Sequence, residues 1–296
     1  MKWAKYQHIV RLGDSDCEGI LNGTVYVFSK VDGTNTGISL DDNGEIRVNS
    51  RNRVLTLEQD NQGCMAYVLS QPKFEQYLKK HPNHYLYGEF LIKNSIKDYE
   101  DDAWHKVYIF DVVEQIDEEH YRYLSYEEYV PLLEEFGIEY IPLIVKLDHP
   151  TEEQVKEYED KCTFLMKDSK PGEGIVVKSF DYTNPYGHIV WAKVVRSAFK
   201  IAHKTKITVD TDSIEERIIN DLFTSEFIEK EYNKILNEDG GWTSKSIPKF
   251  LGIIWHTFII EESFNMIKKY KEPKIDFRLL HKFAIEKVKE IKSDLF

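Results

Sequence analysis

Short, turn-bounded runs of apolar residues dominate positions 1–203 of the chain. They are rich in β-branched and aromatic side chains, which favour strands, and several end near turn residues such as Gly33. Parallel strands need a long crossover between them, usually a helix, so runs with few helices between them predict antiparallel sheets. The predicted strands are 24–30, 36–40, 45–50, 85–92, 106–113, 174–179 and 189–195.

Helical patterns are few before residue 203 and continuous after it. The earlier ones are 72–80, 125–136 and 151–162, the last of which begins with Thr151 close to a capping signal. After the polar stretch 203–213, apolar residues recur at helical spacing over 213–237, 247–270 and 276–292. We therefore predict an α+β chain, with an antiparallel-sheet domain over 1–205 and a small all-helical domain over 206–296.

Cysteine usage and hydropathy restrict where such a chain can work. The three cysteines are scattered without CxxC spacing, which argues against a zinc site and against a disulfide framework. No apolar run approaches the length of a membrane span, and residues 1–10 lack the apolar stretch of a signal peptide. We expect an intracellular, cytoplasmic protein with no membrane partner.

The charge is negative overall but unevenly distributed. The net charge of −12 argues against a general nucleic-acid coat, although it permits a locally basic groove. Acidic runs at 98–102 and 114–119 are expected to be solvated surface. Over 265–296, nine basic and five acidic residues give +4, so this segment is either a contact for a polyanion or a solvated helix face.

Charged residues recur inside or beside the apolar strands. They are Lys30, Glu89, Glu173, Lys178 and Lys193. Because burying one unpaired charge costs several kcal/mol, these residues need partners. Separate salt bridges on half-exposed strands are one explanation. We prefer a bound polyanion with a metal ion, which would satisfy the lysines and the carboxylates together.

Lys30 itself ends an apolar run, at the start of the sequence KVDGTN. Taken alone, Asp32-Gly33 between two extended runs favours a β-hairpin. The other charged positions, in order along the chain, favour a different interpretation of the same lysine.

In that order, the motifs resemble the covalent nucleotidyltransferase superfamily of polynucleotide ligases and mRNA-capping enzymes. The family's elements are KxDG (KVDG here), a later carboxylate strand (YLYGEFLI), an aromatic-plus-Asp strand (KVYIFDVV), an EG(I/V)VxK strand (EGIVVK) and a final lysine strand (IVWAKVV). They span about residues 24–200. The added Asn35 resembles the RNA ligase 2 type, although that type often has His where this chain has Asp32. The resemblance implies an antiparallel-sheet nucleotidyltransferase domain, like an ATP-grasp ligase domain.

The helical region after residue 205 separates the possible activities. Members that are DNA ligases or capping enzymes follow the catalytic domain with an OB β-barrel, whereas the RNA ligase 2 type follows it with helices. The resemblance thus implies an ATP-dependent RNA ligase that joins 3′-OH and 5′-phosphate ends, at nicks in duplex RNA or at bridged ends. Its partners would be RNA and ATP with Mg²⁺ (or Mn²⁺), and it would act as a monomer. A DNA ligase or capping-type enzyme, and a catalytically silent nucleic-acid-binding module, are the alternatives.

The resemblance also implies how the nucleotide is activated. Lys30 would attack the α-phosphate of ATP and form lysyl-AMP, and AMP would then pass to the RNA 5′ end. A free lysine is almost entirely protonated at neutral pH, so it must be activated. We expect neighbouring Lys178 and Lys193, the other catalytic candidates, to disfavour a proton on Lys30 and to neutralise the triphosphate.

Further residues receive binding roles from the same resemblance. Glu89 would hold a ribose hydroxyl, Phe110 would stack on adenine, and Glu173 would bind the metal ion. Arg51 would grip a phosphate, and Asn35 would orient the adenylated nucleotide and the RNA end. The expected nucleotide-binding set is Lys30, Asp32, Gly33, Asn35, Arg51, Glu89, Phe110, Glu173, Lys178 and Lys193.

One position departs from the family pattern. The last strand of the family carries lysines at alternate positions, but here Val195 occupies the second. Because side chains alternate along a strand, Arg196 should face away from Lys193 unless a bulge re-aims it. Arg196 or Lys200 could supply the missing cation.

Overall fold

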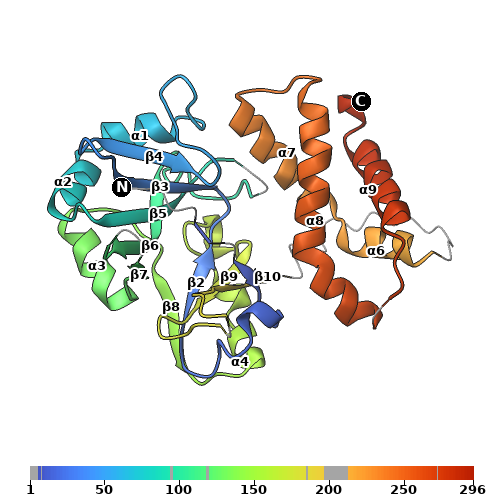
Figure 1. Cartoon of the computed structure of the whole chain (residues 1–296), viewed down its shortest axis with the longest axis horizontal. Coiled ribbons are helices and arrows are strands. Elements are labelled where there is room, and N and C mark those ends of the chain that lie inside the picture. Colours follow the sequence, from blue (N-terminus) through green and yellow to red (C-terminus); the bar gives the residue numbers. More distant parts are fainter. Residues whose placement is uncertain are drawn as a thin grey trace. The chain divides into compact units, whose positions relative to one another are not determined.

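The computed structural model describes residues 6–7, 9–93, 96–117, 120–184, 186–196, 213–271 and 273–296. The chain divides into two compact units, Met1–Val195 and Arg196–Phe296 (Figure 1). The boundary expected at 205–206 lies outside the described residues. The first unit holds the sheets and the second, as far as it is described, is helical.

Two five-stranded sheets form the first unit. The first sheet has the order β1 (Val10–Arg11), β10 (Ala192–Val195), β9 (Gly174–Lys178), β2 (Thr24–Lys30), β8 (Leu143–Asp148). The second has the order β4 (Ile46–Ser50), β3 (Thr34–Leu40), β5 (His84–Phe90), β6 (Val107–Gln115), β7 (Tyr121–Tyr123). Every neighbouring pair is antiparallel except β1 and β10. The predicted α+β fold with antiparallel sheets is confirmed.

The turn after Lys30 crosses from one sheet to the other. β2 pairs with β8 and β9, whereas β3 pairs with β4 and β5, so the hairpin suggested by Asp32-Gly33 is wrong. At the crossing the backbone passes close to β5: a Cβ added at Gly33 would lie 2.5 Å from the carbonyl oxygen of Phe90. Glycine is therefore required here by close approach of two backbones.

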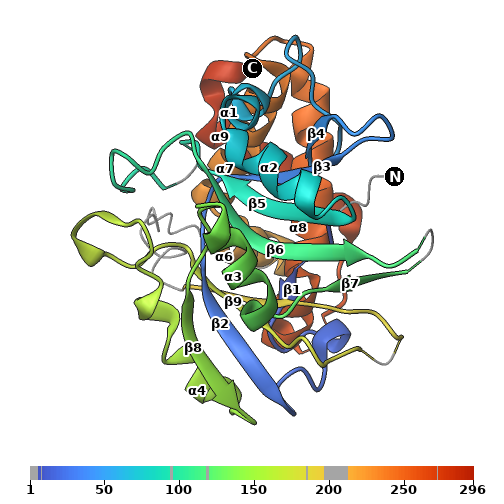
Figure 2. The same cartoon turned by 90° about the vertical axis from the view of Figure 1, so that its left-hand side faces the viewer.

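Each sheet buries an apolar outer face. Ile38, Leu86 and Val112 of the second sheet pack under α1 (Cys64–Ser70), α2 (Pro72–Lys80) and α3 (Tyr126–Glu135). Figure 2 shows α2 and α3 covering this face of the sheet. Val27 and Val177 of the first sheet pack with residues such as Val155 of α4 (Glu152–Lys156). Since successive side chains point to opposite faces of a strand, the alternate residues of both sheets lie on the inner faces.

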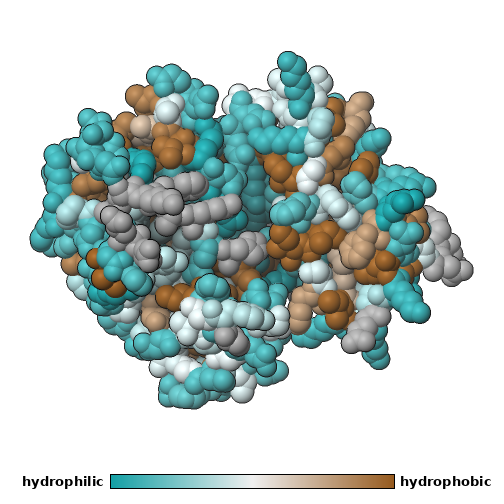
Figure 3. Space-filling model, viewed as in Figure 1, coloured by the Kyte–Doolittle hydropathy of each residue, from teal (hydrophilic) through white to brown (hydrophobic). Residues whose placement is uncertain are grey.

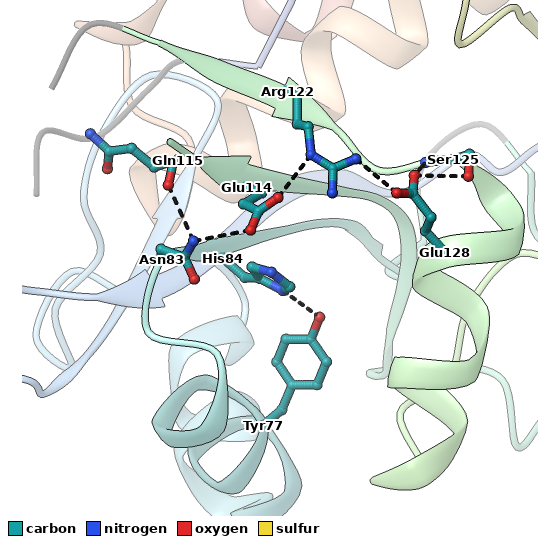
Figure 4. A network of polar contacts seen from close by, with 8 residues as sticks. All are labelled: Tyr77, Asn83, His84, Glu114, Gln115, Arg122, Ser125 and Glu128. Atoms are coloured by element: carbon teal, nitrogen blue, oxygen red, sulfur yellow. Dashed lines mark hydrogen bonds and ion pairs between the residues drawn. The ribbon is translucent and has the colours of Figure 1, made fainter. Parts of the chain in front are cut away.

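A polar network fastens α3 to the edge of the second sheet (Figure 4). Arg122 of β7 donates to Glu114 of β6 and to Glu128 of α3, each at 2.8 Å. The backbone N–H of Ser125, the N-cap of α3, donates to Glu128 at 2.7 Å. One arginine thus joins two strands to the start of the helix.

The second unit is built from α6 (Ile214–Leu222), α7 (Ser225–Asp239), α8 (Ser246–Tyr270) and α9 (Phe277–Ile291). The helical pattern predicted over 213–237 forms two helices, because the Thr224 side chain accepts from Phe227 N–H and starts a new helix there. Phe250, Phe258 and other apolar residues form its core, and apolar side chains also reach the surface of this unit (Figure 3). Among the described helices, none combines the length and the apolarity needed to cross a bilayer.

Some elements were not predicted. α1, β1, β7 and β8 carry weak local patterns, and α4 is shorter than the helix expected over 151–162. The capping signal at Thr151 is confirmed. The Thr151 side chain accepts from Gln154 N–H, and the Gln154 side chain accepts from Thr151 N–H.

Gly174 offers a test of how closely β9 and β10 approach. A Cβ at this position would lie 2.1 Å from the carbonyl oxygen of Val194, and φ is +154°. We expect Gly174→Ala to lower the free energy of unfolding by about 3 kcal/mol or more. Gly23→Ala is the control, because a Cβ there meets nothing within 4 Å. Equal denaturant midpoints for the two variants would contradict the close approach.

Candidate active site

Three lysines share the inner face of the first sheet. Val27 and Val177 lie in the outer core, so alternation turns Lys30 of β2 and Lys178 of β9 inward. Lys193 of β10 also faces inward, because its neighbours Ala192 and Val194 belong to the outer core. This arrangement explains the charged residues inside apolar strands. One face of each strand belongs to the outer core, and the other faces the second sheet across the region that we call the inner space.

The second sheet contributes carboxylate, amide and aromatic groups from its own inner face. Asn35 of β3 stands directly opposite Glu89 of β5 in the ladder. Further along β5, Tyr87 pairs with Asp111 while the next residue, Gly88, pairs with Ile109, so Phe110 has no partner in the ladder. A bulge of this kind lets consecutive residues face the same side, and it turns both Phe110 and Asp111 toward the inner space.

Lys30 is held by a carboxylate. Its Nζ lies 2.7 Å from Oε2 of Glu173, the residue before β9, and the side chains are 18% and 3% exposed. The amine therefore lies at the accessible end of the inner space rather than in bulk water. The nearest charged partner of Lys30 is an acid and not a second lysine.

Glu89 interacts electrostatically with the same amine. Its side chain is partly buried and accepts from the backbone N–H of Gly33 at 3.0 Å. Burial raises the pKa of Glu89 to about 7, and the positive charges of Lys30 and Arg51 and the Gly33 N–H act in the opposite direction. The site thus brings Lys30, Arg51, Glu89 and Glu173 together.

Asn35 and Asp32 differ in their surroundings. Within the described part of the chain, the buried Oδ1 of Asn35 has no hydrogen-bond partner, as expected of a group that contacts a ligand. Asp32 is buried and accepts from Ile96 N–H at 2.9 Å, while its own N–H donates to the hydroxyl of Tyr99 at 2.8 Å. Asp32 therefore anchors a neighbouring loop.

That loop contains the acidic run 98–102, which was expected to be solvated. Tyr99 is 1% exposed and the N–H of Glu100 donates to Leu165 O, so part of the run is fixed against the segment that leads to Glu173. Only its acidic side chains remain at the surface, where Asp101 pairs with Lys167 at 2.6 Å.

Lys178 occupies the opposite, buried end of the inner space. Its Nζ donates to Asp111 Oδ1 at 2.7 Å and to Phe110 O at 2.6 Å. Burial lowers the pKa of Lys178, and the Asp111 carboxylate opposes this shift. Lys178 pairs with Tyr26 in the ladder, four residues before Lys30. At about 3.3 Å per residue, the backbone positions of the two lysines are therefore about 13 Å apart along the strands. The expected crowding of Lys30 by Lys178 is therefore not what the geometry provides.

Lys193 and Val195 lie nearer to Lys30. Lys193 is 9% exposed and pairs with Val176, and Val195 pairs with Gly174, which in turn pairs with Lys30. No bulge interrupts β10, so Val195 keeps the inward position of the family's second lysine. The strand ends before Arg196, and Lys200 lies outside the described residues.

Sequence reasoning gave no role to Asp111, Tyr6 or Trp191. Asp111 accepts on its second oxygen from the Tyr6 hydroxyl at 2.5 Å and from Trp191 Nε1 at 3.2 Å, and it is fully buried. An aspartate in the apolar run KVYIFDVV was a usable signal. No local pattern indicated a role for Tyr6, because its hydrogen-bond partner Asp111 is 105 residues away in the sequence.

The carboxylates near Lys30 suit a hard divalent cation. Glu173 and Glu89 present carboxylate oxygens, the ligand type that Mg²⁺ prefers. Across the described residues, no group of three or more His, Cys, Asp and Glu side chains could hold a metal ion. Such an ion would therefore complete its shell with phosphate oxygens and water, as Mg²⁺ commonly does in nucleotide-binding sites.

Comparisons with known proteins give a consistent picture. A family model described as RNA ligase matches residues 23–195. A mutant of the Naegleria gruberi RNA ligase with AMP and Mn is 21% identical with a TM-score of 0.53, over 68% of this chain and 58% of that chain. The same ligase with PPi is 22% identical with a TM-score of 0.53, over 67% and 58%. This chain therefore spans less than two thirds of the neighbour's length. No curated protein matches it.

Glu89 makes the stability of the fold depend on pH. Its carboxyl has a pKa of about 7 in the folded chain against 4.5 ordinarily, so between these values the folded state keeps a proton that the unfolded chain has released. Stability should therefore fall as the pH rises through this window. We expect Glu89→Gln to be more stable than the wild type at pH 8, by on the order of 2 kcal/mol, and equal to it below about pH 4.5.

Urea unfolding of both proteins from pH 4 to pH 8 measures this difference. The exposed Glu58→Gln is the matched control, for which the curves should stay parallel. Parallel curves for Glu89→Gln as well would show that Glu89 titrates as a solvated carboxylate.

Proposed function

The chain belongs to the RNA ligase family, and from this membership and the geometry of the site we propose that it is an ATP-dependent RNA ligase that works through lysyl-AMP. The observation that carries the proposal is the position of Lys30. Its amine is 18% exposed, lies 2.7 Å from Glu173 and is electrostatically coupled to Glu89. An accessible amine among carboxylates that suit a metal ion is appropriate for attack on a nucleotide phosphate.

In the first step Lys30 Nζ bonds to the α-phosphorus of ATP. The bond from that phosphorus to the bridging oxygen breaks, and pyrophosphate leaves with the electron pair. The ammonium must lose one proton before attack and another as the N–P bond forms. Glu173 Oε2 is within hydrogen-bond distance to accept the first proton, and the ion pair must open before the amine can attack.

The remaining side chains would orient the nucleotide. Phe110 turns inward at the bulge and supports stacking on adenine. Glu89 and Asn35 Oδ1, which has no partner among the described residues, support contacts to sugar hydroxyl or amino groups. Arg51, whose positive charge acts on Glu89, is suited to bind a phosphate group. A divalent cation held by Glu173 would supply neutralisation of the charge that develops on the triphosphate.

In the later steps AMP leaves Lys30 for the RNA. The RNA 5′-phosphate oxygen attacks the lysyl-AMP phosphorus and releases the amine. The 3′-hydroxyl then attacks the activated 5′-phosphate, and AMP departs as the phosphodiester forms. Each transfer forms one bond at phosphorus as another breaks, so no further energy source is needed.

We further propose that the helical unit grips duplex RNA and that nicks or bridged ends are the preferred substrates. The net +4 of residues 265–296 supports contacts to backbone phosphates, which carry most of the affinity in such complexes. Helices over the described residues 213–271 and 273–296 differ from the β-barrel of DNA ligases and capping enzymes. The three buried free cysteines agree with an intracellular location, and we expect a monomer.

A catalytically silent RNA-binding module is the second candidate. The observation in its favour is Val195, an apolar side chain on the inner face at the level of Lys30. The close Lys30–Glu173 pair and the coupled Glu89 favour the ligase instead.

Self-labelling separates these candidates. Incubated with α-labelled ATP and Mg²⁺, the wild type should carry label through a denaturing gel, because the lysyl-AMP bond is covalent. Label should be absent with GTP and in Lys30→Ala. Lys156→Ala is the control and should label normally, because Lys156 is an exposed lysine that pairs with Glu152 on its own helix. A wild type without label would favour the silent module.

A nick that already carries AMP on its 5′-phosphate bypasses the first step. We expect Lys30→Ala to seal such a duplex RNA nick within about tenfold of the wild-type rate, since the amine only carries AMP before this stage. Conversion of labelled RNA on a sequencing gel measures the rate, with an unadenylated nick as the control. A complete loss of sealing would give Lys30 a further role in closing the nick.

A further inference from the structure

The buried end of the inner space contains a polar network with no role in the transfers described above. Lys178 Nζ donates to Asp111 Oδ1 at 2.7 Å and to Phe110 O at 2.6 Å. The other oxygen of Asp111 accepts from the Tyr6 hydroxyl at 2.5 Å and from Trp191 Nε1 at 3.2 Å. A buried charge pair with this many hydrogen bonds holds its members in one geometry.

Lys178 is badly placed to bind a phosphate. It is 3% exposed, and the rings of Phe28, Phe110 and Trp191 lie 5.0, 5.5 and 5.7 Å from its Nζ. It stands about 13 Å along the strands from Lys30, where the α-phosphate must react, at about 3.3 Å per residue. Its donors are directed at protein acceptors.

Both acceptors of Lys178 belong to the bulge of β6. There Phe110 and Asp111 face inward together because Phe110 has no ladder partner. The Tyr6 ring packs 5.0 Å from Phe110 and 5.1 Å from Tyr87, so Tyr6 supports the bulge from the N-terminal segment while Lys178 holds it from β9. A bulge lacks ladder bonds, and these contacts replace them.

We infer that Tyr6 and Lys178 are positioning residues that hold the Phe110 ring as a stacking platform for the nucleobase. The inference rests on the proposed function and assigns this network to the base end of the nucleotide rather than to its phosphates. A platform of this kind acts on nucleotide binding and leaves the chemistry at phosphorus unchanged. Pyrophosphate carries no base, so its binding is independent of the network.

Tyr6→Phe tests this directly, because it keeps the ring and removes only the hydrogen bond to Asp111. In self-adenylation we expect the KM for ATP to rise about tenfold with kcat within about twofold, as for loss of one hydrogen bond to a charged group. In the reverse reaction, in which preformed lysyl-AMP is discharged by pyrophosphate, the KM for pyrophosphate should not change. Thermal unfolding of each variant verifies that it is folded.

Tyr85→Phe is the matched control. Tyr85 belongs to the same apolar cluster as Tyr6 and Tyr87, but its hydroxyl donates to Gln115 Oε1 at 3.2 Å. The KM for ATP in this control should stay within about twofold of the wild type. A paired variant, Lys178→Met with Asp111→Asn, removes both charges together, because removing one would leave the other buried and unpaired. Its KM values should change as in Tyr6→Phe.

The outcomes separate the two proposals. If the KM for ATP in Tyr6→Phe equals that of Tyr85→Phe, the platform is not held by Tyr6 and the inference fails. A parallel rise in the KM for pyrophosphate would place the network at the phosphate end and would also overturn it. A wild type that never labels with ATP would instead overturn the proposed function itself.

Discussion

The ion pair between Lys30 and Glu173 joins the end of β2 to the residue before β9, and the candidate site is organised around it. A space between two apolar sheets penalises every unpaired charge, so each inward-facing charge needs an opposite partner. Lys30 meets Glu173 at the accessible end, and Lys178 meets Asp111 at the buried end. The same constraint leaves the more exposed amine as the one that can change partners when a ligand enters.

The two ends of the inner space consequently differ in chemistry. At the Lys30 end, the amine is 18% exposed beside the buried Glu173 carboxylate, and Asn35 Oδ1 has no partner within the described part of the chain. At the Lys178 end, aromatic rings enclose the charges and hydrogen bonds satisfy them. A nucleotide differs in the same way between its ends, with charged phosphates at one end and a flat aromatic base at the other. This correspondence links the physical layout to the proposed reaction.

Much of the first unit could be predicted because its signal is local. The strand containing Lys30 was predicted with its observed bounds, and the apolar runs around the charged residues identified which charges needed partners. The turn at Gly33 was open to two interpretations, because Asp-Gly favours a turn without specifying which sheet the next strand joins. Asp32 was assigned to the nucleotide, yet it accepts from Ile96, a loop residue whose proximity no local pattern encodes.

The sequence by itself determined the residue types, their order and the alternation that separates a core face from a charged face, since these depend on neighbours within a few positions. Tertiary structure alone decided the strand register, which puts Lys178 about 13 Å from Lys30 at about 3.3 Å per residue. It also decided the bulge that turns Phe110 and Asp111 to one side, and the contact of Tyr6 with Asp111. These features depend on groups distant in sequence, whose pairing is selected by packing and hydrogen bonding over the whole fold.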